Sequence, residues 1–208
     1  VSLWISKVLS TRGKKINAFA KAVFYLPSVT NQVALVIVWN FLFSPAFGLV
    51  ASIFRILKLD PISWFDSPVT AIPLLALLIC TYGLGQPVIL YTAAINGIPD
   101  CYFEAARIDG ATENQIFFSI TLRLLHGTTT YILITSTIGM LQIFAVPYLM
   151  TNGGPSFRTS TLLMLVYTSA FQNGSFGYAS AIGVVLFFIT AAIAFIQFRM
   201  MRQDAIEY

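Results

Sequence analysis

The stretch Tyr178–Phe198, YASAIGVVLFFITAAIAFIQF, decides the fold class, because its 21 residues include no Asp, Glu, Lys or Arg. A helix rises about 1.5 Å per residue, so this stretch is long enough to cross roughly 30 Å of bilayer hydrocarbon. Three more apolar stretches of similar length occur, at Ala22–Phe43, Ala71–Ile95 and Thr128–Met150. Each charge kept out of the bilayer centre avoids a cost of about 3 kcal/mol. The pattern therefore favours four membrane-spanning helices over buried helices of a soluble protein.

The composition agrees with this interpretation. Hydrophobic residues make up 57% of the 208 residues and charged residues 10%, whereas soluble domains carry about 25% charged residues. The net charge of +4 is too small and too dispersed to predict nucleic-acid binding. We therefore predict an all-α, polytopic integral membrane protein. Residues 22–208 should form its membrane domain, and residues 1–21 the end of an earlier helix followed by a basic loop.

The basic residues predict the orientation in the membrane. Nine of the twelve Lys and Arg residues lie before the first span, between the second and third, or after the fourth. Because positive charge is retained on the cytoplasmic side, residues 1–21, residues 98–125 and the C-terminus are predicted to be cytoplasmic. The connections 44–70 and 151–177 should then face outward. Within the second of these, Thr161–Phe171 is apolar but short, which fits a helix lying at the membrane interface.

The cytoplasmic segment 98–125 begins with PDCYFEAARIDG, which spans Pro99–Gly110. Gly110 can supply a left-handed helix cap, and Thr112 and Gln115 have the spacing of a capping box that starts a second helix. Two helices joined by a tight turn are therefore expected. The segment has four acidic and two basic residues, so a protein partner is favoured over lipid headgroups or DNA.

Several sequence stretches resemble one known family. Glu104-Ala105-Ala106, followed by Gly110 and Ile120-Thr121-Leu122, resembles the cytoplasmic EAA motif of permease subunits of binding-protein-dependent ABC importers. Further stretches resemble the maltose-type, multiple-sugar branch: Phe24–Pro27, Trp39–Phe43, Asn152–Pro155 and Phe176–Ala181. The resemblance implies a type I ABC importer permease fold, which usually has about six spans. Its N-terminal part is then expected to be missing from this chain.

One position departs from the family pattern. The chain has Leu122-Arg123 where the family usually has Leu-Pro. Without this proline we expect a straighter second coupling helix, with Arg123 reaching toward the headgroups.

The resemblance also implies a function, partners and a location. The chain would form half of the translocation path for a sugar or related small solute, in the cell membrane of a bacterial-type cell. A separate dimer of ATP-binding subunits would hold ATP and Mg²⁺, and this chain would need no cofactor of its own. A second permease subunit, an extracellular solute-binding protein and membrane lipid are the other expected partners. The residues expected to couple to the ATPase are Glu104, Ala105, Ala106, Asp109 and Gly110.

Two stripes of small, polar and aromatic residues are candidates for the translocation path. Each stripe follows the i, i+3, i+4, i+7 spacing of one helix face. Their positions correspond to those that line the sugar site in maltose-type permeases. Helix packing is the competing interpretation, because small residues commonly allow membrane helices to approach closely. The stripes are Ile79, Tyr82, Gly83 and Gln86, and Ser136, Gly139, Met140 and Ile143.

No catalytic or metal-binding constellation is apparent in the sequence. His126 is the only histidine and has no partner at ligand spacing, and Cys80 and Cys101 predict no disulfide framework. Gly13-Lys14 lacks the other residues of a phosphate-binding loop, so we predict that the chain is not an enzyme. An ion-coupled carrier is the main alternative, although the four spans lack the ionisable residue that such carriers usually keep in the membrane. A membrane-embedded enzyme is a third.

Overall fold

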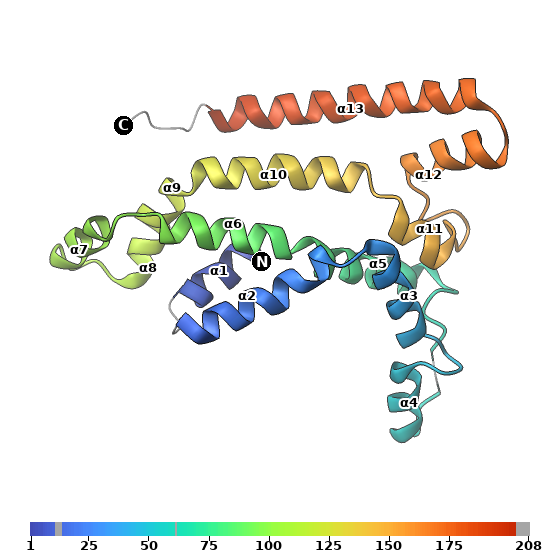
Figure 1. Cartoon of the computed structure of the whole chain (residues 1–208), viewed down its shortest axis with the longest axis horizontal. Helices are drawn as coiled ribbons and strands as arrows, with labels where there is room; N and C mark the ends of the chain where they lie inside the picture. The colour runs from blue at the N-terminus through green and yellow to red at the C-terminus, as the bar shows by residue number, and fades with distance from the viewer. Residues whose placement is uncertain (11–13, 61, 203–208) are drawn as a thin grey trace. The chain divides into compact units, whose positions relative to one another are not determined.

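The computed structural model describes residues 1–10, 14–60 and 62–202, and within these ranges the only regular elements are helices (Figure 1). The prediction of an all-α fold is therefore confirmed. The chain divides into two compact units, each assembled from separate parts of the sequence. Unit 1 comprises Val1–Leu26, Gly83–Thr137 and Ile193–Tyr208, and unit 2 comprises Pro27–Tyr82 and Ile138–Ala192.

Unit 1 is built around α6 (Gly85–Asn96), against which the N-terminal helix α1 (Ser2–Ser10) packs. Its buried core consists of Tyr91, Leu125 and Ile132. The unit also contains most of α2 (Lys14–Val29) and the first part of α10 (His126–Leu141). Its remaining elements are α7 (Asp100–Ile108), α8 (Glu113–Gln115), the π-helix η1 (Ile116–Thr121), α9 (Leu122–Leu124) and the end of α13.

Unit 2 has its core where α3, α5 and α11 meet. Val36, Leu75, Leu78, Val146 and Met150 are buried there, with Trp39, Phe43, Phe65 and Ile79 packed around them. The unit also contains several short helices and the first part of α13 (Phe176–Arg202). Its elements are α3 (Gln32–Leu42), α4 (Leu49–Ile56), α5 (Pro68–Gly83), α11 (Ala145–Thr151), α12 (Leu162–Tyr167) and the π-helix η2 (Thr168–Gln172).

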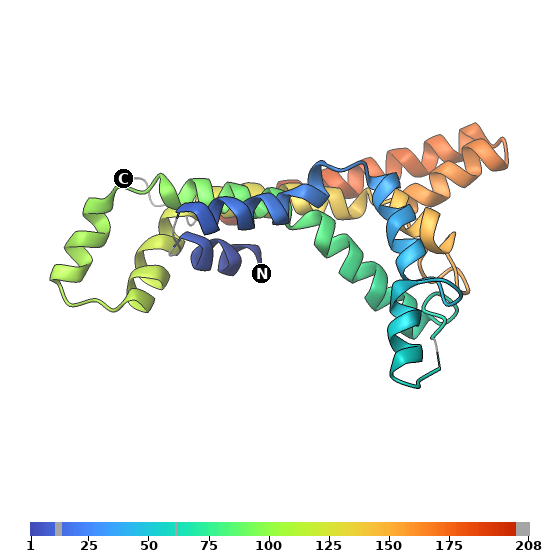
Figure 2. The same ribbon diagram turned by 60° about the horizontal axis from the view of Figure 1, so that its bottom comes forward.

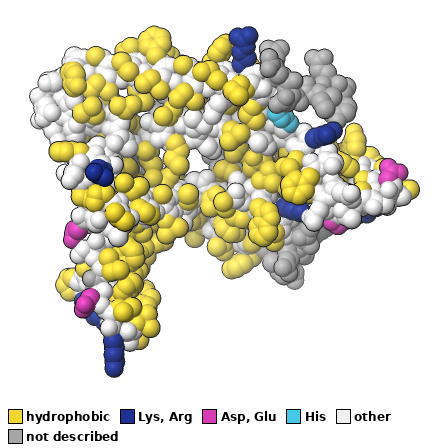
Figure 3. Space-filling view, turned by 180° about the vertical axis from the view of Figure 1, so that it is seen from behind, with side chains coloured by type: hydrophobic (Ala, Val, Ile, Leu, Met, Phe, Trp, Pro, Cys, Tyr) yellow, Lys and Arg dark blue, Asp and Glu magenta, His cyan; other side chains and the backbone are white. Residues whose placement is uncertain are grey.

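Among the residues that the structure describes, two helices are long and apolar enough to cross a membrane: α13 (Phe176–Arg202), and the helix over His126–Thr151 that includes α10 (His126–Leu141). Hydrophobic side chains dominate the face shown in Figure 3. Many of the large apolar side chains of α13 are exposed, including Phe187 and Phe195. Exposure of such residues along a whole helix fits contact with lipid, and the chain is an integral membrane protein.

The other two predicted spans are bent pairs of helices. The prediction of one continuous helix over Ala22–Phe43 is wrong, because α2 (Lys14–Val29) ends before a break and α3 begins at Gln32. Asn31 caps α3 by accepting a hydrogen bond from the amide of Val33 at 2.8 Å. α2 also begins at Lys14, inside the segment expected to be a loop.

The second predicted span, Ala71–Ile95, is interrupted between α5 and α6 at Leu84. Pro87 explains this break, since it has no amide hydrogen to donate to the carbonyl of Gly83. With each bent pair counted as one span, up to four spans remain.

The connection before α13 contains a sharp turn and a short helix. Asn152 and Gly153 have φ angles of 47° and 80°, as a sharp left-handed turn requires. A helix is present over most of the predicted Thr161–Phe171, as α12 continued by η2, which together span Leu162–Gln172; its position at the membrane interface stays a prediction.

Candidate functional site

The segment 98–125 forms an elbow of two helices, α7 and α8, joined by the turn at Gly110 (Figure 2). Gly110 has φ +78° and donates a hydrogen bond to the Arg107 carbonyl at 3.1 Å. The Ala111 amide donates to the Ala106 carbonyl at 2.9 Å. These two bonds are those of a Schellman motif, which pairs carbonyl groups that a helix end otherwise leaves open. The predicted left-handed cap is confirmed.

The second helix of the elbow begins as the sequence predicts. The Thr112 amide donates to Gln115 Oε1 at 2.8 Å, and the Gln115 amide donates to Thr112 Oγ1 at 3.4 Å, which is a reciprocal capping box. Arg107 and Glu113 form an ion pair across the turn at 3.0 Å. Both side chains are well exposed, so this pair fixes geometry more than it stabilises the fold.

Regular α-helix does not continue to Leu125. Residues Ile116–Thr121 form the π-helix η1, in which Thr121 Oγ1 reaches the Ile116 carbonyl at 3.4 Å. We expected a straighter helix here, but a π-helix occupies most of it. Arg123 follows η1 and its side chain is exposed. Short π-helical stretches often mark functional positions, so η1 is a candidate point of movement.

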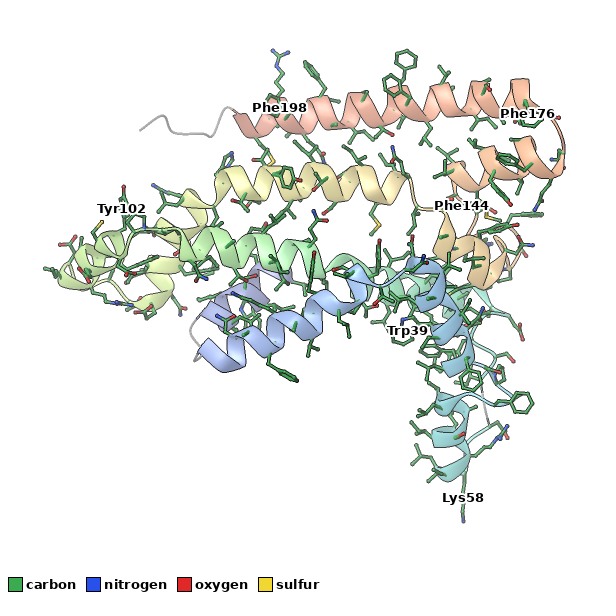
Figure 4. The ribbon with its side chains drawn as sticks, in the orientation of Figure 1. Trp39, Lys58, Tyr102, Phe144, Phe176 and Phe198 are labelled. Atoms are coloured by element: carbon green, nitrogen blue, oxygen red, sulfur yellow. The ribbon has the colours of Figure 1, made fainter. Side chains whose placement is uncertain are left out.

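Four of the five predicted coupling residues are exposed on the elbow: Glu104, Ala105, Asp109 and Gly110. Ala106 is buried, so in this structure its side chain offers little surface to a partner. The structure adds two apolar side chains that the sequence analysis did not single out. Ile108 is 86% exposed and Tyr102, labelled in Figure 4, is 51% exposed. The elbow therefore presents acidic, small and large apolar groups together.

The first predicted path stripe is divided between two helices. Ile79 and Tyr82 lie on α5 and are half-buried, Gly83 ends that helix, and Gln86 lies exposed on α6. The break at Leu84 interrupts the regular spacing from which we inferred one common face.

The second stripe keeps its helical spacing for three of its four members. Ser136, Gly139 and Met140 are exposed on α10. Ile143 lies beyond the end of α10, and its carbonyl accepts a hydrogen bond from Thr161 at 2.7 Å. The prediction that all four share one helix face is therefore wrong for Ile143. At Gly139 an added Cβ would meet no atom within 4 Å, so this glycine is not required by a close helix contact here.

Unit 2 contains an open pocket of about 90 Å³ beside the break between α2 and α3. It combines two aromatic side chains, Trp39 and Tyr82, with the polar side chains of Gln32 and Thr81. Only Tyr82 was predicted as a site residue. Its remaining walls are apolar, from Pro27, Leu35, Val36, Leu78 and Val146.

Trp39 packs at the edge of the unit 2 core and stacks on Phe43, with ring centroids 5.7 Å apart (Figure 4). These contacts hold the orientation of the Trp39 ring. Aromatic rings bind the apolar faces of sugars, while amide and hydroxyl groups bond their hydroxyls. Gln32 and Trp39 were missed because α3 brings them to Tyr82 only through tertiary packing.

The described part of the chain holds no cluster of three or more potential metal ligands. His126 Nε2 lies 2.5 Å from the Met201 carbonyl, so the ring is used in linking α10 to α13 within unit 1. Cys80 and Cys101 are free and exposed.

The broken spans, the long apolar helices and the exposed elbow define a polytopic permease. Residues 4–203 match the family described as binding-protein-dependent transport system inner membrane component, and the chain belongs to this family. The crystal structure of a bacterial alginate ABC transporter, in complex with its alginate pentasaccharide-bound periplasmic protein, contains a chain with the same fold. The TM-score is 0.89 at 21% identity, covering 99% of this chain and 72% of that one.

Two relatives show the same similarity in sequence. The probable ABC transporter permease protein YurN of Bacillus subtilis is 31% identical over 91% of this chain and 65% of its own length. The sulfoquinovosyl glycerol transport system permease protein SmoG of Agrobacterium fabrum is 34% identical over 81% of this chain and 54% of its own. The chain thus spans less than two thirds of the length of either relative.

Proposed function

We propose that this chain is the membrane-spanning subunit of an ATP-driven importer and forms half of the path for a sugar or related small solute. Family membership supports the transport role, and the relative SmoG, which is named for sulfoquinovosyl glycerol transport, supports the solute class. The main structural observation in support of the proposal is the exposed elbow. Its turn is held by backbone hydrogen bonds, so it can move as a rigid piece when a partner pushes on it.

The elbow would dock into an ATPase subunit through Glu104, Ala105, Asp109 and Gly110. Exposed Ala105 and Gly110 allow close approach, while Ile108 and Tyr102 offer apolar area for burial. Glu104 would accept a charge-assisted hydrogen bond from a basic partner residue. Removing one member of such a pair once it is buried costs about 3–5 kcal/mol.

The pocket of Trp39, Tyr82, Gln32 and Thr81 supports a sugar as the transported solute. A pocket of this size accommodates part of a small solute, as expected for half of a path shared with a second permease. We also keep Gln86, Ser136, Gly139 and Met140 in the proposed path, because all four are exposed.

The proposal includes the rest of the assembly. A dimer of ATP-binding subunits would bind ATP and Mg²⁺, and an extracellular solute-binding protein would deliver the solute. The basic N-terminal segment, the elbow and the C-terminus would be cytoplasmic, because most Lys and Arg residues lie there.

Purification of the complex through a tag on this chain tests the proposal, with mass spectrometry to identify its subunits. The expected result is co-purification of an ATPase, a second permease and a binding protein. Uptake of the binding protein's ligand into reconstituted vesicles should need ATP and should persist when ionophores collapse the ion gradients. Uptake that follows the ion gradient instead would favour an ion-coupled carrier.

A further inference from the structure

The N-terminal helix α1 is joined to α6 by a buried hydrogen bond. Ser6 is fully buried, and its Oγ lies 2.9 Å from the Ser2 carbonyl and 3.1 Å from the Val88 carbonyl. Val88 is also fully buried, so water does not compete with this bond. A hydroxyl in a site without water holds its partner firmly, and α1 and α6 are therefore expected to move together.

The residue after Ser6 reaches the elbow. Lys7 Nζ lies 3.3 Å from Asn114 Oδ1 on α8 and 4.1 Å from the centroid of the Phe117 ring on η1. The Phe117 side chain is buried, so the ammonium group lies against a ring that has little freedom to turn. A cation within about 6 Å of a ring centroid is attracted to the face of the ring. One side chain of α1 thus bonds to both parts of the second coupling helix.

The place where Lys7 acts is also the irregular part of that helix. Phe117 lies in the π-helix, whose backbone hydrogen bonds are less regular than those of an α-helix, so neighbouring side chains help to decide its shape. The Lys7 contacts cross from α1 to this stretch. They provide a physical connection from the elbow through Phe117 and α1 to α6, which bears Gln86.

We propose that Lys7 is a positioning residue for coupling: it holds the second coupling helix to α1, so that movement of the elbow is transmitted to α6. This inference rests on the proposed function, because it takes the elbow to be the docking site of an ATPase. Lys7 itself contacts neither ATP nor solute. Its loss should separate ATP hydrolysis from movement of α6 while leaving the complex assembled.

The test uses the complete complex, purified through this chain and reconstituted in vesicles of bacterial phospholipid. Cys80 and Cys101 are replaced by Ser, and Ala93→Cys places a single reporter thiol at an exposed position of α6. The rate of labelling by a fluorescent maleimide is measured without nucleotide and after trapping with MgATP and orthovanadate. This readout requires no knowledge of the solute.

In the parent complex trapping should change the labelling rate. In Lys7→Met this change should shrink about two- to fivefold, the equilibrium factor that an exposed cation–π contact is worth. Lys7→Arg should restore it, because a guanidinium also binds the ring face. Lys21→Met, which removes a basic residue of α2, is the matched control and should behave as the parent. ATP hydrolysis should continue in all four.

Phe117→Leu is the second variant, and it keeps an apolar side chain while removing the ring. Phe117→Leu should reduce the trapping-induced change in labelling rate as much as Lys7→Met does. The double variant should show little further reduction. A full trapping response in assembled Lys7→Met, an equal loss in Lys21→Met, or no response in the parent would each overturn the inference. Gly110→Val serves to separate the two proposals: if it retains ATPase association and the full response, the elbow itself is not the coupling site.

Discussion

Replacing Gly110 by Val tests the role of the elbow, because the expected free-energy cost comes from one known source, the backbone conformation of the turn. Gly110 has φ +78°, and a Cβ added there would meet no atom within 4 Å. A Cβ at this position therefore has no steric overlap with neighbours, and the main penalty is the left-handed backbone itself. That penalty is about 1–2 kcal/mol for a residue with a side chain, and a β-branched residue lies at its upper end.

The alternative for the Val variant is to leave the left-handed conformation and open the turn. It would then lose the bonds from the Gly110 and Ala111 amides, each worth about 0.5–1.5 kcal/mol. Because the two costs are similar, the native turn and an opened turn should both be populated. A shift of 1–2 kcal/mol lowers the equilibrium ratio of native to opened turn by about 5- to 30-fold.

The assay is retention of the ATPase on the purified complex at increasing salt, together with ATP-driven transport. Gly110→Val should weaken both, and Gly110→Asn should weaken them less, because Asn tolerates the left-handed region better. Gly127→Val is the matched control, since Gly127 also has open space around it but lies in a helix without positive φ. Wild-type ATPase retention in Gly110→Val, or equal losses for Asn and Val, would refute the reasoning.

Three further predictions concern topology and the path. Cys101 is native and exposed, and it should resist an impermeant thiol reagent outside intact cells, whereas Ser156→Cys should react; the reverse pattern would contradict the orientation. Gln86→Leu should lower uptake by assembled complexes by the value of one hydrogen bond, about 0.5–1.5 kcal/mol, and Tyr82→Ala should lower it further because a ring is also lost. Unchanged uptake in both would remove them from the path. Trp39→Ala should raise the solute concentration needed for half-maximal uptake, and an unaltered value would show that the pocket binds no solute.

The elbow could be predicted in detail because its rules are local. Gly110 suits the left-handed cap whatever surrounds it, and the Thr112 and Gln115 side chains need only each other's backbone to form the capping box. Such geometry depends on a few consecutive residues. Burial of Ala106 could not be seen this way, because it depends on what packs beneath α7.

The helix breaks show the limit of an argument from hydrophobicity. A scan for charge treats Ala22–Phe43 and Ala71–Ile95 as uniform, yet Asn31 and Pro87 carry the information that ends a helix. Both residues are visible in the sequence, but our prediction gave more weight to the length of the apolar stretches than to these two helix-ending residues. The pocket is different in kind: Trp39 and Tyr82 are far apart in the chain, and only the packing of α3 on α5 and α11 brings them together.

The break between α2 and α3 has a consequence for how this segment is solvated. A helix interrupted at membrane depth exposes amide and carbonyl groups that hydrocarbon cannot bond, so such a break persists only beside protein or water. Asn31 bonds the amide of Val33, and Gln32 opens onto the adjoining pocket. The two faces of this segment therefore need different surroundings: one face is suited to lipid, and the other needs water or protein beside it. A hydropathy profile averages residues from all faces of the segment, so it does not show the position at which water is needed.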